Sequence, residues 1–210
     1  MDFKPHIYFE ILCLLCCLLS LKHTRHSILF IFVFYLPVVL FTETSSYFIR
    51  YNNHWVYNGF ILFQLFFFSF FFFRAIKSSF FKKVILLTSF VFLTFYLINL
   101  LFIQGFNRFN YYSIILVSLL LIIYAGRFML QLADEENAGS FWRSPLFWIS
   151  LSCLLFFSGS FMYFSAWDIL VNAKTDKRGL LYNNLFQILN VLHYAMLSIG
   201  FLCPIIIRRK

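Results

Sequence analysis

The chain has 210 residues, of which 62% are hydrophobic and only 12% are charged. Soluble domains average roughly 45–50% apolar and about 25% charged residues, so this composition excludes a soluble globular protein. The formal net charge is +9, but the basic residues follow or precede apolar segments and do not form one polar face. We therefore expect a membrane protein whose basic residues meet anionic lipid headgroups, and no nucleic-acid partner.

Seven apolar segments are long enough to cross a bilayer, for which a helix needs about 20 residues. These segments are apolar on every face, whereas strands of a membrane barrel would alternate apolar and polar residues. Short polar breaks separate the segments, and no long linker divides the chain. The sequence predicts an all-α polytopic transmembrane helix bundle, a single domain over residues 1–210, with spans at 6–21, 28–48, 56–76, 84–105, 111–131, 145–167 and 182–206.

The distribution of Lys and Arg predicts the orientation, because cytoplasmic loops carry the excess of basic residues. Seven spans place the two termini on opposite sides of the membrane. Eleven basic residues fall on the side of the C-terminus: Lys22, Arg25, Arg74, Lys77, Lys82, Lys83, Arg127, Arg143, Arg208, Arg209 and Lys210. Six fall on the other side: Lys4, Arg50, Arg108, Lys174, Lys177 and Arg178. We therefore expect the N-terminus outside and the C-terminus in the cytoplasm.

Several local signals concern helix boundaries and packing. Ser144 is a candidate cap for the sixth span, and Pro145 suits its first helical position. The small residues at 158–160 would let a neighbouring helix approach closely, and Pro37 is expected to kink the second span. The Phe-rich run at 66–73 is interpreted as apolar filler that faces lipid.

Polar side chains from five spans fall at one depth, in the half of the membrane that is expected to face outside. They are Glu10, Glu43, Asn58, Gln64, Asn99, Gln104, Asn184, Gln187 and Asn190, and His193 lies near the midplane. In the seventh span, Asn183, Gln187, Asn190 and Tyr194 recur at helical spacing and line one face. We predict an outward-open ligand pocket formed by Glu10, Glu43, Gln64, Asn99, Asn184, Gln187, Asn190 and His193. The alternative is that the amides are interhelical hydrogen bonds worth about 0.6 kcal/mol each, and that the two carboxylates lie near enough to the interface to be hydrated.

No catalytic or metal motif is recognisable in the sequence. There is no Gly-x-Ser-x-Gly and no His-Glu-x-x-His pattern, and the pair His23 and His26 is accompanied by Lys22 and Arg25, which repel a cation. The five cysteines, at 13, 16, 17, 153 and 203, lie in apolar runs and are interpreted as small apolar residues, with palmitoylation as the alternative. We expect no catalytic residues, no metal and no cofactor.

Three short motifs resemble a family of small, uncharacterised, multi-span inner-membrane proteins of Bacteroidota. They are Asn-His-Trp-Val-Tyr-Asn at 53–58, Pro-Leu-Phe-Trp-Ile-Ser at 145–150 and Phe-Ser-Gly-Ser-Phe at 157–161. The resemblance implies a bacterial inner membrane and an association with signalling systems, and it supplies no catalytic residues.

The first functional hypothesis is a sensory or signalling-accessory protein whose polar pocket binds a ligand and whose bundle relays to a membrane partner such as a sensor kinase. The alternatives are a scaffold or assembly subunit of a larger membrane complex, and a membrane-embedded lipid-modifying enzyme that uses Glu10, Glu43 and His193 as acid and base groups. A transporter is disfavoured, because neither repeats nor paired broken helices are detectable.

Overall fold

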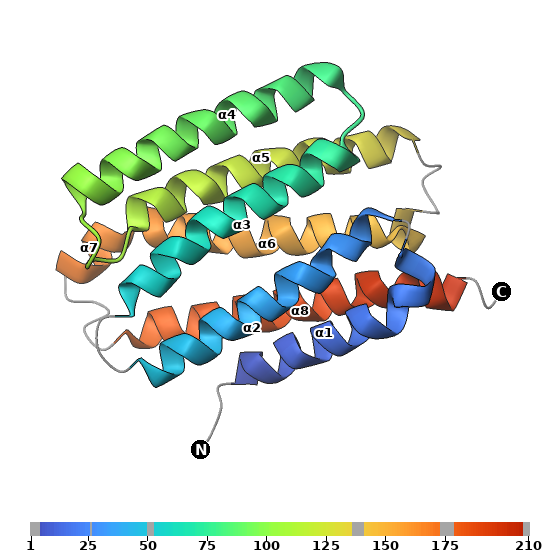
Figure 1. Cartoon of the computed structure of the whole chain (residues 1–210), viewed down its shortest axis with the longest axis horizontal. Coiled ribbons are helices and arrows are strands. Elements are labelled where there is room, and N and C mark those ends of the chain that lie inside the picture. Colours follow the sequence, from blue (N-terminus) through green and yellow to red (C-terminus); the bar gives the residue numbers. More distant parts are fainter. Residues whose placement is uncertain (1–4, 26, 50–52, 136–140, 173–178, 208–210) are drawn as a thin grey trace.

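A computed structural model describes residues 5–25, 27–49, 53–135, 141–172 and 179–207, and every regular element in these ranges is helical (Figure 1). The elements are α1 (Pro5–Thr24), the 3₁₀ turn η1 (Ile28–Ile31), α2 (Phe32–Phe48), α3 (His54–Ala75), α4 (Ser79–Ile98), the π-helical turn η2 (Asn99–Ile103), α5 (Tyr111–Glu135), the 3₁₀ turn η3 (Phe141–Arg143), α6 (Pro145–Ser165), α7 (Trp167–Asn172) and α8 (Leu180–Ile207).

Within the described ranges, seven of these helices are long and apolar enough to cross a membrane. They correspond one to one to the seven predicted spans, and the protein is therefore a multi-pass helical membrane protein. The largest difference is at α4, which begins at Ser79 and not at residue 84. The Ser78 hydroxyl caps this helix by accepting a hydrogen bond from the Phe81 amide, and the long side chains of Lys82 and Lys83 can extend from its first turns toward water.

Successive long helices run in opposite directions, so the two ends of the bundle have different contents (Figure 1). We call the end at which α1, α3, α5 and α8 begin the N-terminal end. There α2 and α6 finish, η2 leads into the loop before α5, and α7 lies alongside. The helix α8 packs against α1 and α6, α6 packs against α5, and α4 contacts only α3, α5 and η2 among its main neighbours. The central helices are therefore α6 and α8, and α4 is peripheral.

Helix boundaries follow the local signals in part. The helix α6 begins at Pro145, as predicted, and Ser144 has the extended backbone of a cap residue. Its side chain makes no capping hydrogen bond, however, so the predicted capping role of Ser144 was wrong. Proline has no amide hydrogen to be satisfied at the first helical position, and the boundary therefore does not need the serine hydroxyl.

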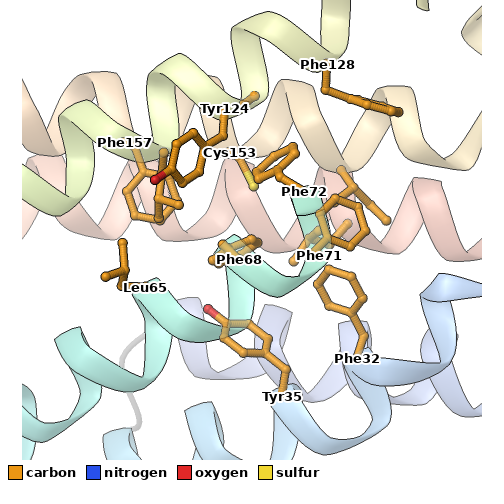
Figure 2. Packing of buried hydrophobic residues seen from close by; sticks show 14 of the residues in the cluster. Phe32, Tyr35, Leu65, Phe68, Phe71, Phe72, Tyr124, Phe128, Cys153 and Phe157 are labelled. Atoms are coloured by element: carbon orange, nitrogen blue, oxygen red, sulfur yellow. The ribbon is translucent and has the colours of Figure 1, made fainter. Parts of the chain in front are cut away.

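The core is aromatic and involves the Phe-rich run directly (Figure 2). Phe68, Phe71 and Phe72 of α3 are fully buried, whereas Phe66 and Phe70 of the same run are 43% and 52% exposed. The Phe71 ring meets the Phe32 ring of α2 edge to face, with centroids 5.6 Å apart. The run is thus only partly lipid-facing filler, because the helical repeat turns three of its rings into the interior.

Small residues mark where α8 approaches its neighbours most closely. A Cβ atom at Gly159 would lie 2.6 Å from the Leu189 side chain, so the expected close approach at 158–160 is confirmed at this glycine. A Cβ atom at Gly200 would lie 3.1 Å from the Pro145 carbonyl oxygen. Both contacts join α8 to α6, and they hold together the two helices that supply much of the cavity described next.

Candidate functional site

A cavity of about 340 Å³ occupies the half of the bundle nearest the N-terminal end. Side chains from α1, α2, α3, α5, α6 and α8 line it, together with Phe109 of the loop before α5. Aromatic rings such as Phe156 and Phe157 of α6 and Phe186 of α8 form part of its wall, and hydroxyl, amide and acidic groups form the rest. This combination of an apolar lining with a few placed polar groups is typical of small-molecule sites, which usually measure roughly 300–1,000 Å³.

The polar wall comes mainly from one face of α8. Asn183, Gln187, Asn190 and Tyr194 all line the cavity, and these are the four residues whose spacing of four, three and four predicted one polar face. His193, one position from Tyr194, also lines it, and the His193 ring lies 5.0 Å from the Phe156 ring, centroid to centroid. The face therefore extends from the first turn of α8 to about the middle of that helix.

The structure brings together most, but not all, of the residues that were predicted to form the pocket. Glu43, Gln64, Gln187, Asn190 and His193 line the cavity. Glu10, also predicted for the pocket, is not a lining residue, but one of its carboxylate oxygens lies within 4.8 Å of a Glu43 carboxylate oxygen. The other two predicted residues, Asn184 and Asn99, do not belong to the lining.

Asn184 is not among the residues that line the cavity, whereas its neighbour Asn183 is, although both residues are exposed. One residue along a helix corresponds to a rotation of about 100°, so Asn183 points into the cavity and its neighbour points away. The grouping of Asn184 with the other pocket residues was therefore wrong, and Asn183 takes its place.

Asn99 is fully buried in a separate hydrogen-bond network that joins the end of α4 to the start of α5. Its amide nitrogen donates to Gln104 Oε1 at 2.9 Å, to Ser113 Oγ at 3.0 Å and to Asn110 Oδ1 at 3.3 Å. Asn99 is thus an interhelical hydrogen-bonding residue, which was the alternative interpretation, and its placement in the pocket was wrong. Depth along a helix does not distinguish these two roles.

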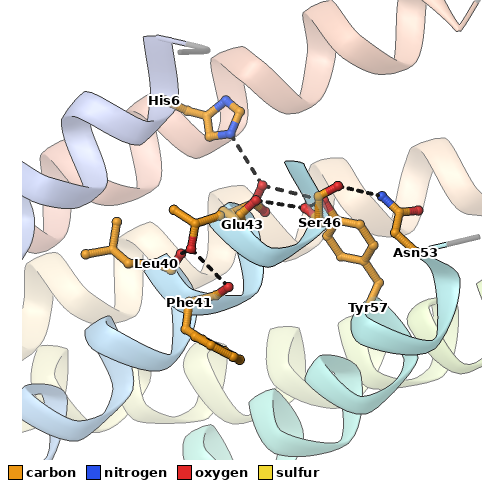
Figure 3. Close-up of polar contacts among 8 residues, drawn as sticks. His6, Leu40, Phe41, Glu43, Ser46, Asn53 and Tyr57 are labelled. Atoms are coloured by element: carbon orange, nitrogen blue, oxygen red, sulfur yellow. Dashed lines mark hydrogen bonds and ion pairs between the residues drawn. The ribbon is translucent and has the colours of Figure 1, made fainter. Parts of the chain in front are cut away.

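The helices α1, α2 and α3 meet around the Glu43 carboxylate, at a part of the cavity that we call the acidic corner (Figure 3). The Glu43 carboxylate of α2 faces His6 of α1, with 3.7 Å between Oε2 and Nε2. The Tyr57 hydroxyl of α3 donates to the same oxygen at 3.5 Å and contacts the Ser46 hydroxyl at 2.8 Å. The Asn53 amide, just before α3, donates to the Ser46 carbonyl at 3.3 Å. Three helices therefore converge on one carboxylate.

A second hollow of about 680 Å³ lies at the same end of the bundle. Its lining includes Gln104 and Arg108 of the loop between η2 and α5, and Trp167 of α7. It shares Phe109 and Tyr182 with the first cavity. The hollow and the cavity therefore adjoin at these two rings.

Sequence reasoning missed two groups at the acidic corner, His6 and Tyr57. A signal for His6 was present, because residues 6 and 10 are four apart and lie on one face of a helix. No comparable signal exists for Tyr57, whose approach to Glu43 depends on how α2 and α3 pack.

Comparison of the chain with protein-family models, with curated proteins and with solved structures returns no match.

Proposed function

We propose that this protein binds a small amphipathic ligand in the cavity and acts as a sensory or signalling-accessory protein of a bacterial inner membrane, relaying through a membrane partner such as a sensor kinase. The observation that carries the proposal is the cavity itself, which is lined by the polar face of α8 together with Glu43 and Gln64. Amides that faced lipid would be unsatisfied, at about 1–3 kcal/mol each, whereas in a cavity they can bind water or a ligand.

The lining defines the chemistry of the ligand. No Lys or Arg is among the described lining residues, and Glu43 supplies a carboxylate. A neutral or cationic head with hydroxyl or amine groups suits this wall, because it can donate to the carboxylate and exchange hydrogen bonds with the amides. The aromatic side of the cavity suits a short apolar body. An anionic head would meet the carboxylate with no Lys or Arg of the described lining beside it.

The proposed orientation places the N-terminal end of the bundle, and with it the cavity, on the outer side of the membrane. Of the described Lys and Arg residues, only Arg108 lies at the cavity end of the bundle. Eight lie toward the opposite end: Lys22, Arg25, Arg74, Lys77, Lys82, Lys83, Arg127 and Arg143. The other eight Lys and Arg residues lie outside the described residues: Lys4, Arg50, Lys174, Lys177, Arg178, Arg208, Arg209 and Lys210. The excess of basic residues favours a cytoplasmic location for the end opposite the cavity.

Photoaffinity labelling tests the proposal. Purified protein in detergent and EDTA is irradiated with a ten-carbon alcohol that carries a diazirine, and the labelled peptides are identified by mass spectrometry. We expect labels on α6 and α8 residues of the lining, such as Phe156 and Phe186, and competition by unlabelled decanol but not by decanoate. Labels confined to lipid-facing residues would contradict the binding proposal and favour a scaffold role.

The matched variants are neighbours on one helix. Gln187→Leu removes a polar group from the cavity wall, and loss of one or two hydrogen bonds is expected to weaken labelling about tenfold. Asn184→Leu changes an exposed amide on the same turn and should leave the labelling unchanged. Equal effects of the two substitutions would show that the label does not report on the cavity.

A lipid-modifying enzyme is the second candidate, because Glu43 and His193 line one cavity and Tyr57 contacts the carboxylate. Purified protein would then convert phospholipids, detected as new lipid species by mass spectrometry, and Glu43→Gln would abolish the conversion. If no lipid changes, the binding role is retained without catalysis.

A further inference from the structure

We propose that His6, Glu10 and Glu43 bind one divalent transition-metal cation of the Zn²⁺ class at the acidic corner of the cavity. The inference goes beyond the proposed ligand binding and does not depend on it. It also departs from the expectation from sequence, which considered only the pair at 23 and 26.

The geometry brings three potential ligand atoms together from two helices. One donor atom from each residue lies within 4.8 Å of the other two, and His6 Nε2 and Glu43 Oε2 are 3.7 Å apart. His6 and Glu10 are four residues apart on α1 and so share one face, and the His6 ring points toward the Glu43 carboxylate (Figure 3). Bond lengths of about 2.0–2.2 Å place tetrahedral zinc ligands about 3.4 Å apart, so small side-chain rotations would complete the site.

An unpartnered atom at this corner points independently to a ligand. Glu10 is only 1% exposed and His6 only 6%. Glu10 Oε2 is buried and makes no hydrogen bond with the described residues. Buried polar atoms are nearly always hydrogen-bonded in folded proteins. A carboxylate oxygen that is both buried and unpaired, next to a second carboxylate and an imidazole, therefore indicates a ligand that binds all three.

The charges lead to the same conclusion. Two neighbouring carboxylates repel each other, and removal from water makes the repulsion more costly. Among the described residues, no Lys or Arg forms an ion pair with Glu10 or Glu43. A divalent cation would neutralise both carboxylates at once and use the imidazole as a neutral donor.

The donor set selects the class of metal. Ca²⁺ and Mg²⁺ prefer six or more oxygen ligands, whereas an imidazole nitrogen with two carboxylates suits Zn²⁺ and its first-row neighbours. Three protein ligands leave a coordination position open, as in catalytic zinc sites. Because His6 and Glu43 line the cavity, the open position would face the cavity and bind water there.

Metal loading of the full chain in detergent tests the proposal. The protein is stripped with EDTA, incubated with ZnCl₂, desalted and analysed for zinc by mass spectrometry, and a tenfold excess of CaCl₂ serves as the competitor. We expect one zinc per chain, unaffected by calcium. His6→Gln, Glu10→Gln and Glu43→Gln should each weaken binding by about 100-fold or more, since even changes outside the ligand set cost 10–100-fold. No binding at 100 µM zinc, by the wild-type protein, would overturn the proposal.

Two control variants remove an imidazole or a carboxylate elsewhere in the protein, so that their zinc binding can be compared with that of the variants at the proposed site. His23→Gln changes the histidine at the other end of α1, and Asp134→Asn changes an exposed carboxylate on α5. Both variants should bind zinc like the wild type. X-ray absorption of the zinc-loaded wild type needs no variant and covers the case in which a substitution prevents folding. Nitrogen and oxygen neighbours near 2.0–2.2 Å are expected, and sulfur neighbours would assign the metal to cysteines and overturn the proposal.

Discussion

At the scale of single residues, Asn58 connects α3 to the loop before α5. Its side-chain nitrogen donates to the Arg108 carbonyl at 2.9 Å and to the Phe106 carbonyl at 3.3 Å, and its side-chain oxygen accepts from the Asn110 amide at 3.1 Å. The Tyr96 hydroxyl of α4 donates to the backbone carbonyl of Asn58 at 2.9 Å. One buried amide thus satisfies three backbone groups of a loop and positions Phe109, which lines both hollows.

We predict that Asn58→Leu destabilises the protein strongly. The substitution leaves two carbonyls and one amide without partners, at about 1–3 kcal/mol for each buried unsatisfied group. Thermal unfolding in detergent, followed by circular dichroism, measures the effect. Asn107→Leu changes an exposed amide in the same loop and should shift the midpoint little. Equal midpoints for the two variants would show that the bridge has no stabilising role.

At the scale of elements, α8 determines the arrangement of the bundle because it contacts both α1 and α6. Its first half presents the polar face to the cavity, and its second half packs Phe201 against Phe32 of α2, with centroids 5.4 Å apart. Gly200 in this second half lies against the backbone at the start of α6. The tightly packed second half of α8 therefore positions its first half, which lines the cavity.

We predict that Gly200→Leu destabilises the bundle, whereas Gly126→Leu does not. A Cβ atom at residue 200 would lie 3.1 Å from the Pro145 carbonyl oxygen and 3.3 Å from an Ile149 side-chain carbon. A leucine would therefore overpack this contact, which typically costs about 1–3 kcal/mol. A Cβ atom at Gly126 of α5 meets nothing within 4 Å, and removing a helical glycine contributes up to about 1 kcal/mol. Unfolding in mixed micelles by SDS titration should place the two variants on opposite sides of the wild type. A stable Gly200→Leu protein would contradict the close packing of α6 and α8.

At the scale of the whole molecule, the bundle is polar at one end and apolar in its middle. The cavity, the second hollow and the Asn99 network all occupy the N-terminal end, while the aromatic core around Phe68 and Phe71 lies deeper. Because the cavity lies near one end of the bundle, it lies nearer one side of the membrane than the other. The side that it faces therefore decides where a ligand or a metal ion would come from.

We predict that the cavity end faces outside. In a variant whose five native cysteines are replaced by alanine, new cysteines at Asn53 and Asn107 should react with a membrane-impermeant maleimide in intact cells. Cysteines at Lys22 and Ser78 should react only after permeabilisation, because the positive-inside rule places that end in the cytoplasm. Labelling of Ser78 from outside would invert the orientation and make the cavity cytoplasmic.

The sequence by itself determined the seven spans, their approximate limits and the polar face of α8. These features are local, because bilayer thickness sets the length of an apolar segment and the helical repeat sets which residues share a face. The limits of α4 differed because a serine cap and two lysines extended the helix beyond its apolar core. Ser78 was a local signal for the earlier start, but residues 77–83 were interpreted as a polar break between spans.

Only the tertiary structure decided how the polar residues of different helices are grouped. Sequence places a residue at a depth along its helix, but the rotation of that helix and its neighbours decide what the side chain meets. Hence Asn99 joined Ser113 in a network, while Glu43 met His6 and Tyr57 across helix interfaces. Lipid solvates any apolar face equally well, so the bundle is arranged by close packing and polar pairing between helices, and these depend on all the helices together.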